Sequence, residues 1–151
     1  MSRAEKAKEY FLQGYACSQA VALAFADDVG VDKETISKMM LPFGGGLGRL
    51  RLTCGAVSGM AAIIGFMFAK AESDAQNKKD TYAITQELVL KFKEEFGSII
   101  CAELLEGKVA VEVGGVAEAR TQEYYKKRPC AEIVAAAAQI LESYLKAQGK
   151  I

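Results

Sequence analysis

Apolar side chains recur at the three- and four-residue spacing of a helix along most of this chain. Ala4, Ala7 and Phe11 form the first stripe, and Gly14 stands where a glycine ends a helix. The same spacing, bounded by capping residues, glycines and prolines, predicts further helices over residues 17–30, 32–42, 53–70, 82–97, 117–128 and 129–145, and residues 101–106, closed by Gly107, could form one more short helix. The pattern is typical of an all-α protein.

The segments between these helices predict connections. Residues 43–48 read F-G-G-G-L-G, which predicts a tightly turned loop, and the polar residues 72–80 predict a second connector. Residues 109–113 alternate valine with other residues and fit either a short strand or an irregular loop. No repeat, low-complexity tract or linker interrupts the chain. We therefore predict one domain over residues 1–151, a bundle of about six to seven helices around a buried central helix.

The predicted central helix carries no charge between Leu52 and Ala69. Its length reaches the lower limit for a membrane span, but glycine, serine, threonine and alanine dilute its apolar character. A helix surrounded by other helices has the same composition. We therefore predict a buried helix and no membrane span.

Composition removes several classes of function. Among 151 residues, 19 Lys and Arg balance 19 Asp and Glu, and histidine is absent. The neutral balance argues against nucleic-acid binding. The lack of histidine excludes Ser-His and Cys-His triads and Cys/His zinc sites within the chain. No carboxylate pair suggests general acid–base catalysis, so thiols are the main candidates for chemistry.

Cysteines stand at the predicted starts of four helices, and no C-x-x-C pair is present. They are Cys17, Cys54, Cys101 and Cys130. A helix N-terminus stabilises a thiolate and lowers the thiol pKa. Arg51 and Arg128 precede two of the cysteines closely, so we expect a lowered pKa and high reactivity at Cys54 in particular. Buried cysteines that serve only as small apolar side chains are the alternative.

The location of the protein bears on what its thiols do. The first eight residues are charged and lack the apolar core of a secretory signal, which predicts a cytoplasmic protein. Cytoplasmic cysteines more often serve redox chemistry, metal binding or packing than structural disulfides.

Small residues mark one face of the predicted central helix. Gly55, Ser58 and Gly59 lie on neighbouring positions of that face, and helix-interior glycines suggest close approach of another helix or of a ligand. The other helix could belong to this chain or to a second copy, which leaves a homo-oligomer open. The glycine loop could bring Arg51 near Cys54, so the candidate ligand-binding residues are Gly55, Ser58, Gly59 and Arg51. The cluster 126–128 (K-K-R) is interpreted as solvated surface.

The cysteine layout resembles the C-GCAxxG-C-C family, whose members are described as redox-active. The matching positions are Cys17, the central C-G-A-V-S-G from Cys54 to Gly59, Cys101 in F-G-S-I-I-C-A-E-L-L and Cys130 in R-P-C-A-E-I-V. The resemblance covers residues 10–145. It implies redox or metal chemistry at the cysteines. Members often lie near genes for transporters or oxidoreductases, which implies a partner of one of those kinds.

Three functions compete on these grounds. In the first, Cys54 is the nucleophile of a thiol redox protein and Cys17, Cys101 or Cys130 resolves the disulfide. In the second, the four cysteines bind a transition metal or an iron–sulfur cluster. In the third, the chain is a helical interaction module whose cysteines only pack. The resemblance favours the redox function slightly over the metal site.

Overall fold

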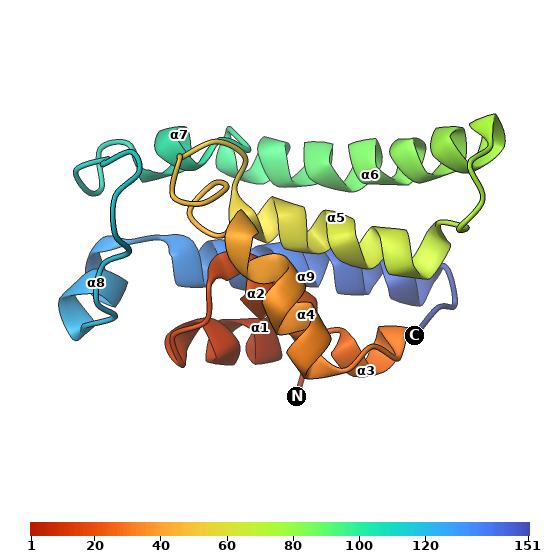
Figure 1. The fold of residues 1–151 in the computed structure, drawn as a ribbon, viewed down its shortest axis with the longest axis horizontal. Helices are drawn as coiled ribbons and strands as arrows, with labels where there is room; N and C mark the ends of the chain where they lie inside the picture. Colours follow the sequence, from red (N-terminus) through yellow and green to blue (C-terminus); the bar gives the residue numbers. More distant parts are fainter.

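The uncharged segment forms α5 (Gly55–Phe68), the helix around which the others pack. Its Met60, Ile63 and Ile64 side chains are completely buried. Helices α2 (Cys17–Leu23), α6 (Ala75–Phe96) and α9 (Cys130–Ala147) pack against it, and α5, α6 and α9 run along the long axis of the molecule (Figure 1). The predicted buried central helix is confirmed. No helix has the combination of length and apolarity that a membrane crossing requires.

The remaining elements complete an all-α protein, as predicted, and the computed structural model describes all residues from 1 to 151. They are α1 (Arg3–Leu12), α3 (Ala26–Val29), α4 (Lys33–Met40), the 3₁₀ helix η1 (Leu41–Phe43), α7 (Cys101–Leu105) and α8 (Gln122–Lys127). Nine α-helices exceed the six to seven expected, because short helices fill segments interpreted as parts of longer ones. A single cluster of 26 buried apolar residues forms the core.

Capping residues set the helix boundaries. Ser2 forms a capping box with Glu5 at the start of α1, and the side chains of Asp32 and Asp74 accept backbone N–H bonds at the starts of α4 and α6. Gly30 and Gly97 end α3 and α6 in the left-handed conformation that glycine adopts without strain. Local sequence therefore determines these helix ends.

Three expected segments differ from the structure, and the structure decides between the two alternatives for a fourth. Residues 17–30 form two helices rather than one, because Phe25 (φ −110°, ψ 10°) departs from helical geometry. Helix α6 begins at Ala75, inside the expected connector, because Asp74 caps it there. Within residues 117–128 only α8 is helical, starting after the cap Thr121. Residues 109–113 form neither strand nor helix, so the irregular loop is the correct alternative.

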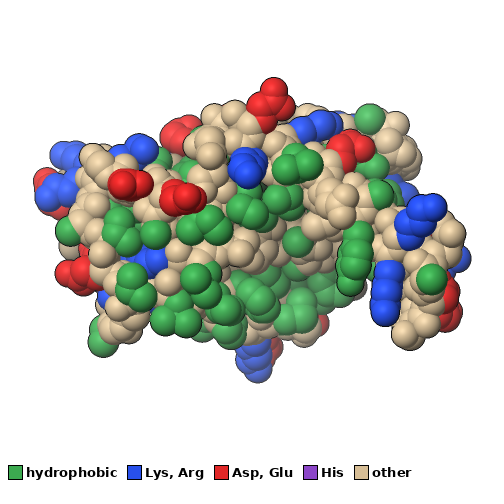
Figure 2. Space-filling view, turned by 90° about the horizontal axis from the view of Figure 1, so that it is seen from above, with side chains coloured by type: hydrophobic (Ala, Val, Ile, Leu, Met, Phe, Trp, Pro, Cys, Tyr) green, Lys and Arg blue, Asp and Glu red, His purple; other side chains and the backbone are tan.

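Apolar side chains gather on the face of the molecule seen from the α6 side (Figure 2). The exposed large apolar residues of the chain include Leu50, Leu52, Phe66 and Leu90. No second copy is present, so the homo-oligomer stays a prediction.

The N-terminal ends of α5, α7 and α9 lie at the same end of the molecule as α8 (Figure 1). Two irregular segments accompany them there: residues 44–54, called the glycine loop below, and residues 106–121, called the acidic loop because it carries Glu112 and Glu118. The starts of α5, α7 and α9, together with α8 and the two loops, therefore lie in one region of the molecule.

Candidate functional site

Each cysteine lies at the start of a helix, as the sequence predicts. Cys17, Cys101 and Cys130 are the first residues of α2, α7 and α9, and Cys54 is the N-cap of α5. The candidate thiols therefore come from four separate elements, and the tertiary fold decides whether they meet.

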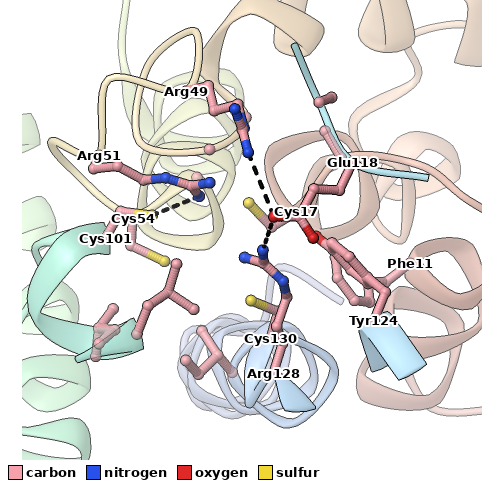
Figure 3. Close-up of a pocket in the computed structure, with 18 of the residues that line it drawn as sticks. Phe11, Cys17, Arg49, Arg51, Cys54, Cys101, Glu118, Tyr124, Arg128 and Cys130 are labelled. Carbon is pink, nitrogen blue, oxygen red and sulfur yellow. Dashed lines mark hydrogen bonds and ion pairs between the residues drawn. The ribbon is translucent and has the colours of Figure 1, made fainter. Parts of the chain in front are cut away.

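The fold brings all four cysteines to the lining of one cavity of about 310 Å³ (Figure 3). Cys54 is buried and the other three are partly buried, and all four are free thiols. The remainder of the lining mixes apolar side chains with arginines and glycines. Thiols that are 29 to 113 residues apart in the sequence thus line one cavity.

The glycine loop is bound to the start of α7 by backbone hydrogen bonds. The Cys101 N–H donates to the Leu52 carbonyl at 2.6 Å, the Ala102 N–H donates to the Arg51 carbonyl at 3.2 Å, and the Cys54 N–H donates to the Ile99 carbonyl at 2.7 Å. These bonds hold the segment that leads into Cys54 beside the segment that begins α7 at Cys101.

Two glycines allow the chain segments at the cavity to approach closely. A Cβ on Gly55 would overlap the Cys17 sulfur, and a Cβ on Gly46 would lie 2.7 Å from Cys101 Cβ. Gly46 also has a positive φ (71°), which disfavours side chains there. Both positions require the absence of a side chain so that Cys17 and Cys101 can occupy their places.

Arg51 is turned into the protein rather than toward solvent. Its side chain is held by two contacts: Nε donates to the Glu112 carbonyl at 2.9 Å, and Nη1 lies 3.7 Å from Cys101 Sγ. Arg51 is only 7% exposed and has a left-handed backbone (φ 63°). The sequence places this arginine near Cys54, whereas its guanidinium contacts Cys101.

Three further arginines line the cavity; one of them, Arg128, was expected near a cysteine, and the other two were not identified as cavity residues from the sequence. They are Arg49, Arg120 and Arg128. The Glu118 carboxylate joins two of them, at 2.7 Å from Arg128 and 3.4 Å from Arg49 (Figure 3). Arg128 is only 8% exposed, which corrects its interpretation as solvated surface. A usable signal was the choice of arginine over lysine, since arginine is the cation suited to buried sites.

Burial raises the thiol pKa values in this cavity. The pKa of Cys17 is raised, the pKa of Cys54 is raised well above its ordinary value, and the pKa of Cys130 is raised to about 12. The lowered pKa expected at Cys54 is therefore wrong, because desolvation disfavours the thiolate more strongly than a helix N-terminus favours it.

The small-residue face of α5 divides between packing and cavity. Gly59 lies against α2, where a Cβ would come within 2.7 Å of the Ser18 carbonyl oxygen, and Ser58 lies outside the cavity lining. Gly55 and Arg51 do line the cavity. Of the four candidate ligand-binding residues, the structure thus brings two to the cavity, and close helix approach accounts for Gly59.

The geometry does not assemble a metal site. No three Cys, Asp or Glu side chains are grouped so that they could hold one ion together. The predicted ligand set of Cys17, Cys54, Cys101 and Cys130 lines one cavity, but this geometry does not bring three of them together around one ion, so the metal site stays a prediction.

Comparison with known proteins gives one finding. A family model described as "Putative redox-active protein (C_GCAxxG_C_C)" matches residues 15–144. No curated protein and no solved structure matches the chain. The match covers most of the chain and includes all four cysteines.

Proposed function

Because this chain belongs to the C-GCAxxG-C-C family, we propose that it performs thiol–disulfide exchange within the cysteine-lined cavity. In this proposal Cys101 is the attacking thiol and Cys17 closes the protein disulfide. The observation that carries the proposal is that all four cysteines line one cavity, with a buried arginine against the sulfur of Cys101.

Arg51 is the reason for assigning the first attack to Cys101. Thiolates are the nucleophiles in disulfide exchange, and a neighbouring cation stabilises them. Cys101 is the only cysteine whose sulfur accepts a hydrogen bond from a cationic side chain. Cys54, the nucleophile expected from the sequence, is more buried and has a pKa raised well above its ordinary value.

Cys17 is the best-placed second thiol. Burial is the largest cause of the raised thiol pKa values, and negative charge on a neighbouring cysteine is a further cause. Charge on Cys101 raises the pKa of Cys17, and charge on Cys17 raises the pKa values of Cys54 and Cys130. These mutual effects support a central position for the Cys17 sulfur among the four. They also mean that ionising one thiol disfavours ionisation of the next, so exchange proceeds through one thiolate at a time.

The reaction balances as a two-electron exchange. The Cys101 thiolate attacks one sulfur of a substrate disulfide, a mixed disulfide forms, and the first substrate sulfur leaves and takes up a proton. Cys17 then attacks the Cys101 sulfur, the protein disulfide forms, and the second substrate sulfur leaves as a thiol. Two cysteine thiols are oxidised and one disulfide is reduced to two thiols.

Trapping by mass spectrometry tests these roles. The reduced protein is mixed with hydroxyethyl disulfide and quenched with acid at set times. Wild type should form a Cys17–Cys101 disulfide, Cys17→Ser should accumulate a mixed disulfide on Cys101, and Cys101→Ser should react slowly. Cys130→Ser is the matched control and should behave as wild type. A protein whose four thiols all stay reduced would leave the helical module with packed cysteines as the better account.

A further inference from the structure

Arginine and lysine are distributed very differently around the cavity. Four of the five arginines in the chain line it, and none of the fourteen lysines does. Only one acidic side chain, Glu118, belongs to the lining. A chain with no net charge thus collects an excess of positive charge around a single cavity.

Two of these arginines have no carboxylate partner within 4 Å: Arg51 and Arg120. Arg120 donates to the Phe11 and Tyr15 carbonyls at 3.1 Å each, and its guanidinium stacks over the Phe11 and Tyr124 rings at 4.5 and 4.9 Å. Carbonyls and ring faces hold both side chains in place without neutralising their charge.

Uncompensated positive charge in a desolvated place is unfavourable unless an anion balances it. Three of the four thiols do not supply that anion at neutral pH, since burial raises the pKa of Cys17, Cys54 and Cys130 and keeps them protonated. The fourth, Cys101, contacts Arg51 and leaves Arg120 without an anion. Glu118 is already shared between Arg49 and Arg128. A ligand is the remaining source of negative charge for Arg120, and it would share Arg51 with the Cys101 sulfur.

The rest of the cavity lining indicates that the ligand also has an apolar part. Leu41, Leu104, Leu105 and Ile133 contribute apolar surface, which suits an organic group better than a bare inorganic ion. The volume of about 310 Å³ is at the lower end of the range for small-molecule sites. The cavity therefore suits a small molecule with both anionic and apolar parts.

We propose that the cavity binds a small organic disulfide bearing carboxylates, with Arg51 and Arg120 holding the carboxylates while the sulfurs face the thiols. This inference rests on the proposed function for the disulfide and on the arginines for the negative charge. Arginine pairs with carboxylates through two parallel hydrogen bonds, which orients a ligand as well as attracting it. The exchange is the one written above: two cysteine thiols are oxidised, and the bound disulfide leaves as two thiols.

A series of disulfides of different charge tests the inference on the unmodified protein. Dithiodiacetate is a dianion, hydroxyethyl disulfide is neutral and cystamine is a dication. We expect the anion to oxidise the protein on the order of tenfold faster than the neutral compound, and the cation to be the slowest. Raising the salt concentration should reduce the difference. Equal rates for all three compounds would overturn the inference and leave thiol exchange standing.

Thiodiacetate separates the anion site from redox chemistry, because it carries two carboxylates on a thioether that cannot be reduced. Calorimetry should detect its binding to wild type, with binding weakened by about tenfold or more in Arg51→Gln and Arg120→Gln. Lys126→Gln, which removes one positive charge outside the cavity, should bind as wild type. Binding without any disulfide exchange would support the anion site and refute the proposed function; no binding would refute the anion site.

Discussion

Gly59→Ala perturbs a close approach between α5 and α2. A Cβ at this position would lie 2.7 Å from the Ser18 carbonyl oxygen and 3.1 Å from Val21 Cβ. Ser18 has little freedom to yield, because its buried hydroxyl donates to the Met40 carbonyl at 2.7 Å. The added methyl must therefore push the two helices apart.

A control substitution in the same helix separates the loss of stability caused by overpacking from the effect of helix propensity. Overpacking costs about 1–3 kcal/mol, while replacing a helix-interior glycine with alanine gains about 1 kcal/mol. Gly65→Ala collects only the gain, because nothing lies within 4 Å of a Cβ there. We therefore expect Gly59→Ala to be less stable than Gly65→Ala by about 1–3 kcal/mol.

Urea unfolding followed by circular dichroism measures this difference as long as both variants keep the wild-type m-value. Equal stability of the two variants, or a more stable Gly59→Ala, would refute the close approach. The same displacement would move Cys17 at the start of α2, so Gly59→Ala should also slow disulfide formation.

Three further predictions concern single groups. Arg51→Gln should slow alkylation of Cys101 by iodoacetamide, a neutral reagent, at pH 7 by about tenfold, because the thiolate loses its neighbouring cation; an unchanged rate would show that the contact does not activate the sulfur. The rate of Cys130 alkylation should continue to rise up to about pH 12, rather than level off near pH 9, since burial raises the pKa of its thiol to about 12. At pH 8, a cysteine with this pKa has about a thousandfold less thiolate than an ordinary cysteine. Because this raised pKa favours the protonated folded state, stability should fall as pH rises from about 9 to 12, and Cys130→Ser should make that fall shallower in thermal unfolding. Asp74→Ala removes the side chain that accepts the Asn77 N–H at 2.6 Å and should cost about 1 kcal/mol in urea unfolding; a loss near zero would mean that water replaces the cap.

Much of the fold follows from local sequence because its signals are local. Apolar spacing and capping residues predict most of the helices, and the cysteines lie at helix starts as expected. The break between α2 and α3 at Phe25 was not predicted, since apolar spacing continues through it. The start of α6 at Ala75 was not predicted either, since polar residues surround it.

The cavity was predictable only in part. That the cysteines would meet was a hypothesis, but which arginines would face them depends on contacts between distant segments. Arg120, for example, is held by the Phe11 and Tyr15 carbonyls from α1 and the turn after it. The sequence predicted a lowered pKa for Cys54, whereas the structure raises it. Burial depends on the whole fold, and it outweighs the local effect of one helix end.

The all-arginine character of the cavity has a consequence for how it responds to its surroundings. Guanidinium groups hold their protons at any pH a cell reaches, and the chain has no imidazole to titrate near neutrality. The positive field around the thiols is therefore constant. Above neutral pH, protons released from this lining come from sulfur or from the Tyr124 phenol, whose own pKa burial raises.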